Sequence, residues 1–380
     1  MSPKSIYFVA GEASGDNHGA ALLRSLREVL PDWQFIGRGG PQMKALAGGD
    51  FHDWIDQAAV VGLWEVVKNY GYFRTQFQET LREIERVQPG AIVLIDYPGF
   101  NLRLARALRK MGLRSRLIYY ISPQVWAWNR GRIKQMARWL DLMLCIFPFE
   151  AELYNKSGLR TIFVGHPMHE RLAPLRHEGE RKPDLVALFP GSRQREIRKI
   201  FPVMLATAQL LSRARPGLRF EVAAASADLA RQIEEQLEAW PNERASFKIE
   251  TGSAAKIMQR AQAGIVASGS ATLEAAYFRL PFVLIYKVSW LTYLAGRMVV
   301  KVDYLGMPNV LANEAVVPEF IQYEARPEAL AAAVGQLLDD PAARARMINR
   351  FDQIVGSLGE GGASARAATV IAGELPAGSS

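Results

Sequence analysis

Short apolar runs recur along the chain with helix-like stretches between them, and this rhythm limits the possible folds more than any other feature. In the first half the runs are Ile6–Ala10, Trp33–Ile36, Ala91–Ile95, Leu117–Ile121 and Leu142–Phe147. After a polar, proline-bearing stretch the rhythm resumes with Leu185–Phe189, Phe220–Ala224, Phe247–Ile249, Gly264–Ala267 and Phe282–Tyr286. Strands that are nearly all apolar and alternate with helices are typical of parallel sheets covered on both faces. The sequence therefore predicts an α/β protein with two successive parallel sheets.

The stretch His177–Asp184 separates the two series of runs and marks a domain boundary. We predict a first domain over residues 1–178 and a second over 179–349. The alanine-rich segment Ala363–Ala372 predicts a final helix, within a C-terminal helical region of about 350–374 that joins the first domain. In such sheets ligands bind beyond the carboxyl ends of the strands, so the loops at those ends are the places to look for chemistry.

Charge and cysteine content narrow the class of protein. Lys and Arg exceed Asp and Glu by 8, which favours nucleic acid, phosphorylated substrates or an acidic membrane surface as partners. Nucleic acid is disfavoured, because the basic residues gather at phosphate-type turns and do not interleave with stacking aromatic residues. The single cysteine, Cys145, lies in an apolar run, which excludes a disulfide framework, predicts a buried thiol and fits a reducing compartment. No window reaches the roughly 18 uninterrupted apolar residues of a membrane-spanning helix, and Glu12 and Asp16 follow the first run where a signal peptide would have a cleavage site.

Two loops of the first half carry candidate chemistry. The loop Gly11–Gly19 follows the first run and opens a helix, but it lacks both the Walker and the Gly-x-Gly-x-x-Gly patterns, so neither a P-loop nor dinucleotide binding is supported. A glycine-rich turn with a capping side chain is the alternative. The loop Asp96–Asn101 follows a strand that would bury a lone carboxylate, and burial raises a carboxyl pKa toward the range that suits a general base. The alternative is that Asp96 caps the helix that begins near Asn101.

Two loops of the second half look like anion sites. The turn Pro190–Arg193 joins a strand to a helix, so its backbone N–H groups and Arg193 can hold a diphosphate. A solvated basic helix start is the alternative, although cations are mildly unfavourable there. The turn Ser268–Glu274 places hydroxyls and N–H groups at another helix start, where Glu274 either complements the helix dipole or accepts hydrogen bonds from ribose hydroxyls.

The sequence predicts neither a metal site nor a cofactor. It contains no Asp-x-Asp pair, and His166 and His169 have no partners at metal-ligand spacing.

Two segments are candidates for contact with lipid. The segment Val60–Phe73 holds more apolar side chains than one core-facing stripe requires, and its candidates are Val60, Val61, Leu63, Trp64 and Val67. The segment Val125–Leu140 combines tryptophans with basic residues four apart, which suits an anionic membrane interface; its candidates are Trp126, Trp128, Arg130, Lys134 and Arg138. Core packing of the aromatic residues remains an equal alternative, and Trp290–Val300 has the same ambiguity.

These loops, together with Ser122–Trp128 and Gly165–Pro167, resemble the lipid-A-disaccharide synthase family over nearly the whole chain. The motifs Gly-Glu-Ala-Ser-Gly-Asp, Ser-Pro-x-Val-Trp-Ala-Trp, Pro-Gly-Ser-Arg and Ser-Gly-Ser-Ala-Thr-Leu-Glu occur in this order. The resemblance implies a GT-B glycosyltransferase fold, in which two Rossmann-like domains with parallel sheets face each other across a cleft. It also implies a metal-independent, inverting transfer of 2,3-diacylglucosamine from UDP-2,3-diacylglucosamine to the 6-hydroxyl of 2,3-diacylglucosamine 1-phosphate, with a β-1,6 disaccharide 1-phosphate and UDP as products.

The resemblance also assigns roles to residues. Asp96 is the expected base or acceptor-orienting group, with Ser14, Asp16 and His18 nearby, and the sequence leaves open whether Asp96 or His18 takes the proton. The residues expected to bind UDP are Gly191, Ser192, Arg193, Ser270, Thr272, Glu274, Asn309, Asn313, Glu319 and Gln322. The implied location is cytoplasmic and peripheral, on the inner face of the inner membrane. Acyl-chain length and a homodimer with exchanged C-terminal helices remain open.

Two other readings compete with this one. A UDP-sugar transferase or 2-epimerase of the same fold, acting on a soluble substrate, would leave the apolar segments as core. A non-catalytic sugar-nucleotide-binding or membrane-scaffold protein would need the second-domain loops but neither Asp96 nor His18.

Overall fold

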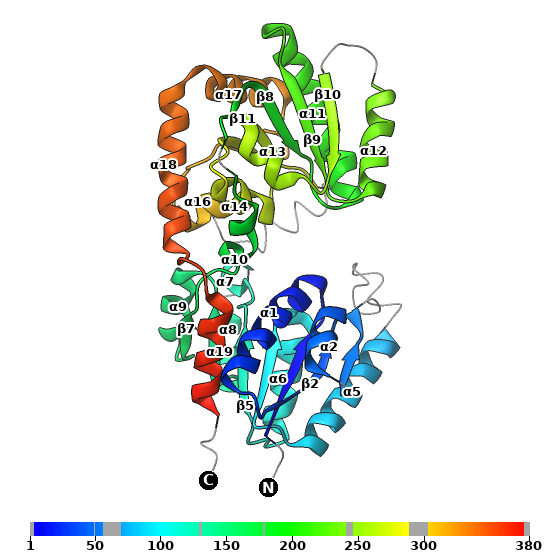
Figure 1. Cartoon of the computed structure of the whole chain (residues 1–380), viewed down its shortest axis with the longest axis vertical. Coiled ribbons are helices and arrows are strands. Elements are labelled where there is room, and N and C mark those ends of the chain that lie inside the picture. Colours follow the sequence, from blue (N-terminus) through cyan, green and yellow to red (C-terminus); the bar gives the residue numbers. More distant parts are fainter. Residues whose placement is uncertain are drawn as a thin grey trace. The chain divides into compact units, whose positions relative to one another are not determined.

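The computed structural model describes residues 4–48, 50–55, 70–128, 131–177, 179–240, 246–288 and 303–375. The chain divides into two compact units (Figure 1), and each is treated by itself below. The first domain comprises Met1–Pro167 and Leu358–Ser380, and the second comprises Met168–Ser357. The division lies before the short helix α10 (Met168–Leu172), whereas the sequence placed it after residue 178. Contacts inside the second domain account for this position, since His169 reaches the carbonyl oxygen of Val355 at 3.3 Å.

The described residues of the first domain form a sheet of seven parallel strands in the order β3-β2-β1-β4-β5-β6-β7. The strands are β1 (Ser5–Ala10), β2 (Gln34–Gly39), β3 (Phe51–Asp53), β4 (Ala91–Ile95), β5 (Arg116–Tyr120), β6 (Leu142–Cys145) and β7 (Thr161–Phe163). The order reverses between β1 and β4, which are neighbours with Ala10 opposite Ile95. Ligands bind at such a reversal in open α/β sheets, beyond the carboxyl ends of the two strands.

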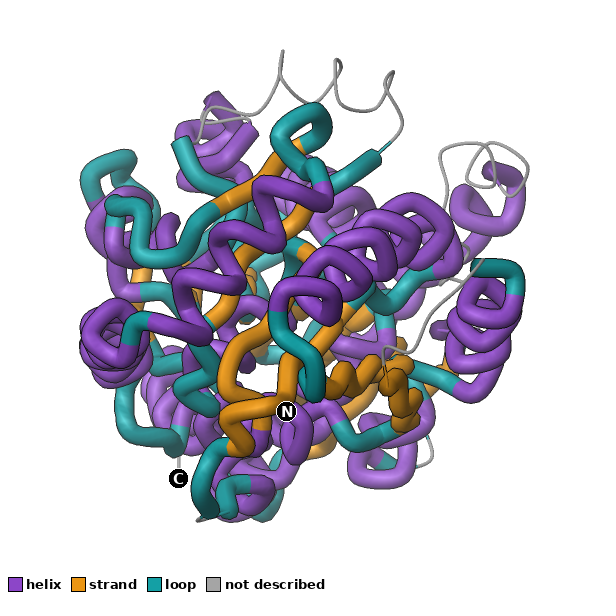
Figure 2. The backbone as a smooth tube through the Cα atoms, turned by 90° about the horizontal axis from the view of Figure 1, so that it is seen from above, coloured by secondary structure: helices purple, strands orange, loops and turns teal. Residues whose placement is uncertain are grey.

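Helices surround the strands (Figure 2), as expected from β1, in which all six residues are buried. The helices are α1 (Ala13–Val29), α2 (Pro41–Ala47), α5 (Tyr70–Val87), α6 (Pro98–Lys110), α7 (Val125–Trp128), α8 (Gly131–Trp139), α9 (Pro148–Asn155) and α19 (Ala363–Glu374). Helix α19 packs against α1 although the two lie at opposite ends of the chain. None of the helices in the described ranges combines the length and the apolarity needed to cross a membrane.

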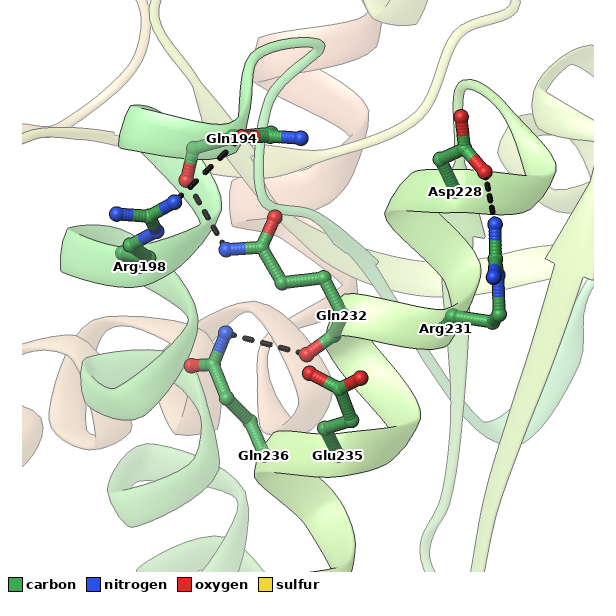
Figure 3. A pocket seen from close by; sticks show the side chains of 7 residues that line it. All are labelled: Gln194, Arg198, Asp228, Arg231, Gln232, Glu235 and Gln236. Atoms are coloured by element: carbon green, nitrogen blue, oxygen red, sulfur yellow. Dashed lines mark hydrogen bonds and ion pairs between the residues drawn. The ribbon is translucent and has the colours of Figure 1, made fainter.

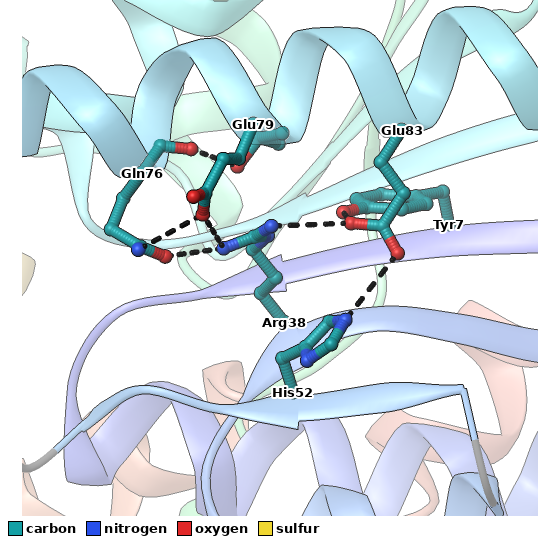
Figure 4. Close-up of polar contacts among 7 residues, drawn as sticks. Tyr7, Arg38, His52, Gln76, Glu79 and Glu83 are labelled. Atoms are coloured by element: carbon teal, nitrogen blue, oxygen red, sulfur yellow. Dashed lines mark hydrogen bonds and ion pairs between the residues drawn. The ribbon is translucent and has the colours of Figure 1, made fainter.

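A polar network under α5 fastens this helix to three strands (Figure 4). Arg38 of β2 is 6% exposed, and its guanidinium lies 3.3 Å from Glu83 and 3.6 Å from Glu79. The hydroxyl of Tyr7 in β1 donates to Glu83 at 2.7 Å, and the ring of His52 in β3 lies 3.7 Å from the other oxygen of that carboxylate. A buried guanidinium is tolerated only when it is paired, so this network fixes α5 against the sheet.

The described part of the second domain holds a sheet of six parallel strands in the order β10-β9-β8-β11-β12-β13. The strands are β8 (Lys182–Phe189), β9 (Arg219–Ala224), β10 (Ser246–Thr251), β11 (Ala261–Ala267), β12 (Phe282–Tyr286) and β13 (Glu319–Ile321). The helices after α10 are α11 (Gln194–Ala214), α12 (Ala227–Glu238), α13 (Ala254–Arg260), α14 (Ser270–Tyr277), α16 (Met307–Ala312), α17 (Pro327–Asp339) and α18 (Pro341–Ser357). Here the strand order reverses between β8 and β11, which places the loops after these two strands at the ligand-binding edge.

The sequence predicted most of these elements. Each of the ten apolar runs lies in a strand to within a few residues, and Cys145 is buried. The strands β3, β7 and β13, three residues each, were not predicted. The C-terminal helical region is two helices, because Gly359, Gly361 and Gly362 all have positive φ between Ser357 and Ala363.

Candidate active site

Asp96 stands at the carboxyl end of β4, at the reversal of the first sheet. Its φ of 45° and the φ of 50° at Tyr97 are in the left-handed region, which residues other than glycine rarely adopt. The surrounding chain enforces this conformation. The N–H of Asp96 donates to Tyr120 at 3.0 Å, while its carbonyl oxygen accepts from the Tyr119 hydroxyl at 2.5 Å and from the Asn101 amide at 2.8 Å. A strained backbone that is held so firmly fixes the direction of the Asp96 carboxylate.

The pKa of Asp96 is raised from 3.8 to about 6. Burial is the largest cause and the negative charge of Glu12 is the second, while a hydrogen bond from the Tyr97 N–H acts in the opposite direction. Glu12 comes from the loop after β1, next to β4 in the sheet. The loops approach closely, since a Cβ added to Gly11 would collide with the ring of Tyr97. A carboxylate with this pKa is largely ionised at neutral pH and still basic enough to accept a proton in catalysis.

The other candidates of the first loop lie in α1 and have different surroundings. The carboxylate of Asp16 is buried and accepts three hydrogen bonds of 3.0 Å from backbone amides at the start of α2, those of Gly40, Gln42 and Met43. These bonds make it a cap of α2 and use both its oxygens, so its position is explained without a substrate. Ser14 is exposed and His18 partly exposed, one helical turn apart on the same side of α1.

The buried carboxylate of Glu150 holds the loop after β5 in place. The indole N–H of Trp126 donates to Glu150 at 2.9 Å, and the Trp126 ring lies edge-on to Phe149 at 4.9 Å between centroids. The hydroxyl of Tyr154 donates to the carbonyl oxygen of Pro123 at 2.8 Å. Burial raises the pKa of Glu150 to about 7. Trp126 is 6% exposed and its polar atom is paired inside the domain, which favours core packing, the alternative that the sequence left open, over membrane contact for this residue.

The other lipid-contact candidates divide into two groups. Lys134 and Arg138 are exposed and four residues apart on α8, whose opposite side buries Ile133 and Met136. The remaining candidates lie outside the described residues, in whole or in their side chains: Val60, Val61, Leu63, Trp64, Val67, Trp128 and Arg130. The segment Trp290–Val300 lies outside them as well.

Arg193 is the N-cap residue of α11 and follows the tight turn after β8. Gly191 has a φ of 116°, which a glycine adopts without strain. The side chain of Arg193 is 70% exposed, and its guanidinium lies 3.2 Å from Glu196 one turn later. The second oxygen of Glu196 accepts from the N–H of Ser192 at 2.9 Å. The loop thus brings a guanidinium to a helix N-terminus, which is a chemical environment for a phosphate.

The loop after β11 lies beside this one, because β8 and β11 are paired. Ser270 is exposed at the start of α14. Thr272 is buried, and its hydroxyl donates to the Gly269 carbonyl oxygen at 2.8 Å. Glu274 pairs with Arg171 at 2.7 Å. Of these three predicted UDP contacts, Ser270 has the exposed side chain, while the other two are engaged within the domain.

The remaining predicted UDP contacts, Asn309, Asn313, Glu319 and Gln322, lie in or near α16 and β13. Asn309 is fully buried and exchanges hydrogen bonds of 2.9 and 2.8 Å with the backbone of Val317, and it donates to Glu319 at 2.8 Å. Glu319 also accepts from the N–H of Gly306 at 2.8 Å, so it caps α16. Gln322, with a φ of 52°, accepts from the N–H of Val288 at 2.7 Å. Asn313 is the exposed, left-handed C-cap of α16.

A polar pocket of about 650 Å³ lies between α11 and α12 and adjoins the Arg193 loop through Gln194 (Figure 3). Its lining side chains bond largely to one another and to nearby backbone. Arg198 lies 3.5 Å from the Gln194 side chain, and Gln232 donates to the Gln194 carbonyl oxygen at 3.2 Å. Within the described ranges, no three His, Cys, Asp or Glu side chains gather closely enough to hold a metal ion.

Sequence reasoning missed Glu12, Glu150 and Glu196 as members of these sites. For Glu12 the signal was available, since the loops after β1 and β4 meet wherever the strand order reverses between those strands. For Glu196 the signal was an acid one helical turn after Arg193. Nothing in the sequence pairs Glu150 with Trp126.

Comparisons with known proteins agree with this architecture. The lipid-A-disaccharide synthetase family model matches residues 6–367. A lipid-A-disaccharide synthase of Geobacter metallireducens is 39% identical and covers 97% of this chain and 96% of its own length. Among solved structures, the glycotransferase of kitacinnamycin aligns with a TM-score of 0.62 at 15% identity, over 99% of this chain and 100% of its own. MurG of Acinetobacter baumannii aligns with a TM-score of 0.57 at 13% identity, over 98% and 100%. The fold is thus GT-B, and the chain belongs to the lipid-A-disaccharide synthase family of hexosyltransferases.

Proposed function

We propose that this enzyme transfers 2,3-diacylglucosamine from UDP-2,3-diacylglucosamine to the 6-hydroxyl of 2,3-diacylglucosamine 1-phosphate in one inverting displacement. The products are the β-1,6 disaccharide 1-phosphate and UDP. The observation that carries the proposal is the Asp96 carboxyl at the β1/β4 reversal, with a pKa of about 6 and a conformation imposed by its neighbours. Family membership supports the substrate class.

Asp96 is the proposed general base of the first domain, which we assign to the acceptor. Its carboxylate takes the proton of the acceptor hydroxyl while the hydroxyl oxygen attacks the anomeric carbon. The bond from that carbon to the phosphate oxygen breaks at the same time, and its electron pair leaves with UDP. A single displacement inverts the anomeric centre. A base positioned in this way contributes roughly 10²–10⁴-fold.

Arg193 is the proposed anchor of the UDP diphosphate, and we assign the donor to the second domain. Its guanidinium can contact two phosphate oxygens at once, and the N-terminus of α11 adds N–H groups aimed at the same anion. Ser270 at the start of α14 is the proposed neighbouring contact. These groups stabilise the charge that develops on the leaving UDP, which is why we propose metal-independent catalysis.

We further propose peripheral attachment to an anionic membrane through a surface that includes Lys134 and Arg138 on α8. Both ammonium and guanidinium groups are exposed there, and each basic residue near an anionic surface contributes about 1 kcal/mol. Flotation of the protein with vesicles that contain an anionic phospholipid tests this. Equal flotation of the wild type and a Lys134→Glu, Arg138→Glu variant would rule out this surface.

The central experiment measures UDP release by purified protein, with and without EDTA, from UDP-2,3-diacylglucosamine plus acylated acceptor. UDP-N-acetylglucosamine serves as the soluble comparison. We expect turnover with the acylated pair alone, no effect of EDTA, and loss of activity in Asp96→Asn and Arg193→Ala. Arg198→Ala removes a cation five residues further along the chain, in α11, and should keep activity. Equal turnover of the soluble sugar would reject the acyl specificity, and full activity of Asp96→Asn would reject the base.

A further inference from the structure

Glu196 occupies the groups that a diphosphate would need. Its two carboxylate oxygens divide between the Ser192 N–H, at 2.9 Å, and the Arg193 guanidinium, at 3.2 Å. Gly191 leaves room for it, since a Cβ at that position would collide with the carboxylate. This loop therefore already holds an anion that belongs to the protein itself.

Ordinary helix capping does not account for this arrangement. In a capping box the acid at the third helical position accepts from the N–H of the N-cap residue, and the N-cap side chain accepts in return. The N-cap here is Arg193, whose side chain can only donate. Glu196 instead reaches the N–H of Ser192, one residue before the helix cap. The Glu196 carboxylate thus binds the loop before α11, where we propose that the diphosphate binds. It does not cap the first turn of the helix.

Tyr286 supports the placement of both charges at the same edge of the sheet. It is the last residue of β12, which pairs with β11 next to the two loops. Burial raises the pKa of Tyr286 most, the charge of Glu196 raises it further, and the charge of Arg193 lowers it. Both the acid and the cation are therefore close enough to the end of β12 to affect Tyr286, in opposite directions.

We infer that Glu196 is an internal competitor of the donor: its carboxylate holds the Ser192 N–H and Arg193 in the free enzyme, is displaced when UDP-sugar binds, and returns as UDP leaves. This inference rests on the proposed donor site. A carboxylate and a phosphate are both anions that accept from the same donors, so they cannot share these groups without repulsion. The carboxylate keeps the loop ordered when the donor is absent and limits how tightly UDP, the product, is retained.

Removing the charge should therefore tighten UDP binding, which is the opposite of the usual effect of removing a group from a site. Because the pair is partly exposed, we expect Glu196→Gln to bind UDP about two- to tenfold more tightly than the wild type. Glu196→Ala should change affinity in the same direction. The inhibition constant of UDP as a product should fall by the same factor, and kcat should not rise. Glu234→Gln, which removes an exposed acid from α12, controls for the general effect of one negative charge.

Isothermal titration of UDP into the wild type, Glu196→Gln, Glu196→Ala, Arg193→Ala and Glu234→Gln tests the inference. Tighter binding by both Glu196 variants, with Glu234→Gln unchanged and Arg193→Ala weakened, is the expected result. Weaker or equal binding by both Glu196 variants, with Arg193→Ala still weakened, would overturn the inference and leave the donor site standing. If Arg193→Ala binds as tightly as the wild type, the donor site itself is wrong and the inference falls with it.

Discussion

Asparagine at position 96 removes one negative charge and keeps the shape of the side chain, so one variant can report both the catalytic and the structural effect of that charge. The backbone should tolerate it, because asparagine is among the residues that adopt the left-handed region most readily. The contacts from the Tyr119 hydroxyl and the Asn101 amide go to the carbonyl oxygen of residue 96 and remain. We expect kcat to fall by roughly 10²–10⁴-fold, the usual contribution of a general base.

The same variant should be more stable than the wild type at neutral pH. The pKa of Asp96 is about 6 in the folded protein against an ordinary 3.8, so the folded state binds the proton more tightly than the unfolded state does. For a carboxyl shifted in this direction, the free energy of unfolding decreases as pH rises from about 4 to about 6. The difference between the two pKa values, at about 1.4 kcal/mol for each pH unit, amounts to about 3 kcal/mol above that range. Asparagine avoids this cost.

Thermal unfolding at two pH values measures the effect. At pH 7.5 we expect Asp96→Asn to gain up to about 3 kcal/mol, which raises the Tm of a domain of this size by roughly 6–12 °C. At pH 4.5 the gain should shrink to about 1 kcal/mol, because most Asp96 carboxyls are then protonated in the folded protein. Asp53→Asn, at an exposed carboxylate of the same domain, should stay within about 0.5 kcal/mol of the wild type. An equal gain at both pH values, or none at pH 7.5, would refute the assignment of a raised pKa to Asp96.

Three further predictions follow from contacts described above. Glu12→Gln removes the charge that helps to raise the Asp96 pKa, so the acid limb of the kcat/KM profile should move from about pH 6 to lower pH; an unmoved limb would exclude this coupling. Gly11→Ala adds a methyl group that collides with the ring of Tyr97, so kcat/KM should fall at least about tenfold. Gly99→Ala, which has open space around it, should keep activity. Equal activities of the two variants would show that the close packing at Gly11 is unimportant. Asn309→Ala leaves the backbone N–H and carbonyl oxygen of buried Val317 without these partners and should cost about 2–4 kcal/mol in urea unfolding, a value that a surface position would not reach.

The strands, and the loops at their carboxyl ends where ligands bind, could be predicted because both depend on the local sequence pattern. A run such as Ala91–Ile95 is apolar throughout and is followed at once by polar loop residues, so its place in a covered parallel sheet follows from composition. The strands β3 and β13 are three residues long, and β3 combines Phe51 with His52 and Asp53. Their strand conformation comes from pairing with a neighbour, which no local pattern encodes.

Side-chain roles were harder to predict because the deciding partners are distant in the sequence. Asp16 looked like a member of the catalytic loop, but its hydrogen-bond donors belong to α2. Trp126 looked like a candidate for membrane contact because basic residues follow it, yet its partner is Glu150 in α9. The influence of Glu12 on Asp96 exists only because β1 and β4 are adjacent in the sheet. In each case the missing information is strand and helix order.

The division of the chain also sets an order for its synthesis. The second domain is one continuous stretch, so a ribosome completes it while the first domain still lacks its last helix, α19. The N-terminal part of the first domain therefore stays incomplete until residues 358–375 are synthesised. Until then, the side of α1 that α19 will cover is exposed. The two segments of the first domain contact each other directly: the N–H of His166 donates to the carbonyl oxygen of Leu358 at 2.9 Å, and Arg366 donates to that of Val164 at 2.8 Å. Loss of the last twenty or so residues would therefore damage the first domain, whose synthesis begins first, and would leave the second domain intact.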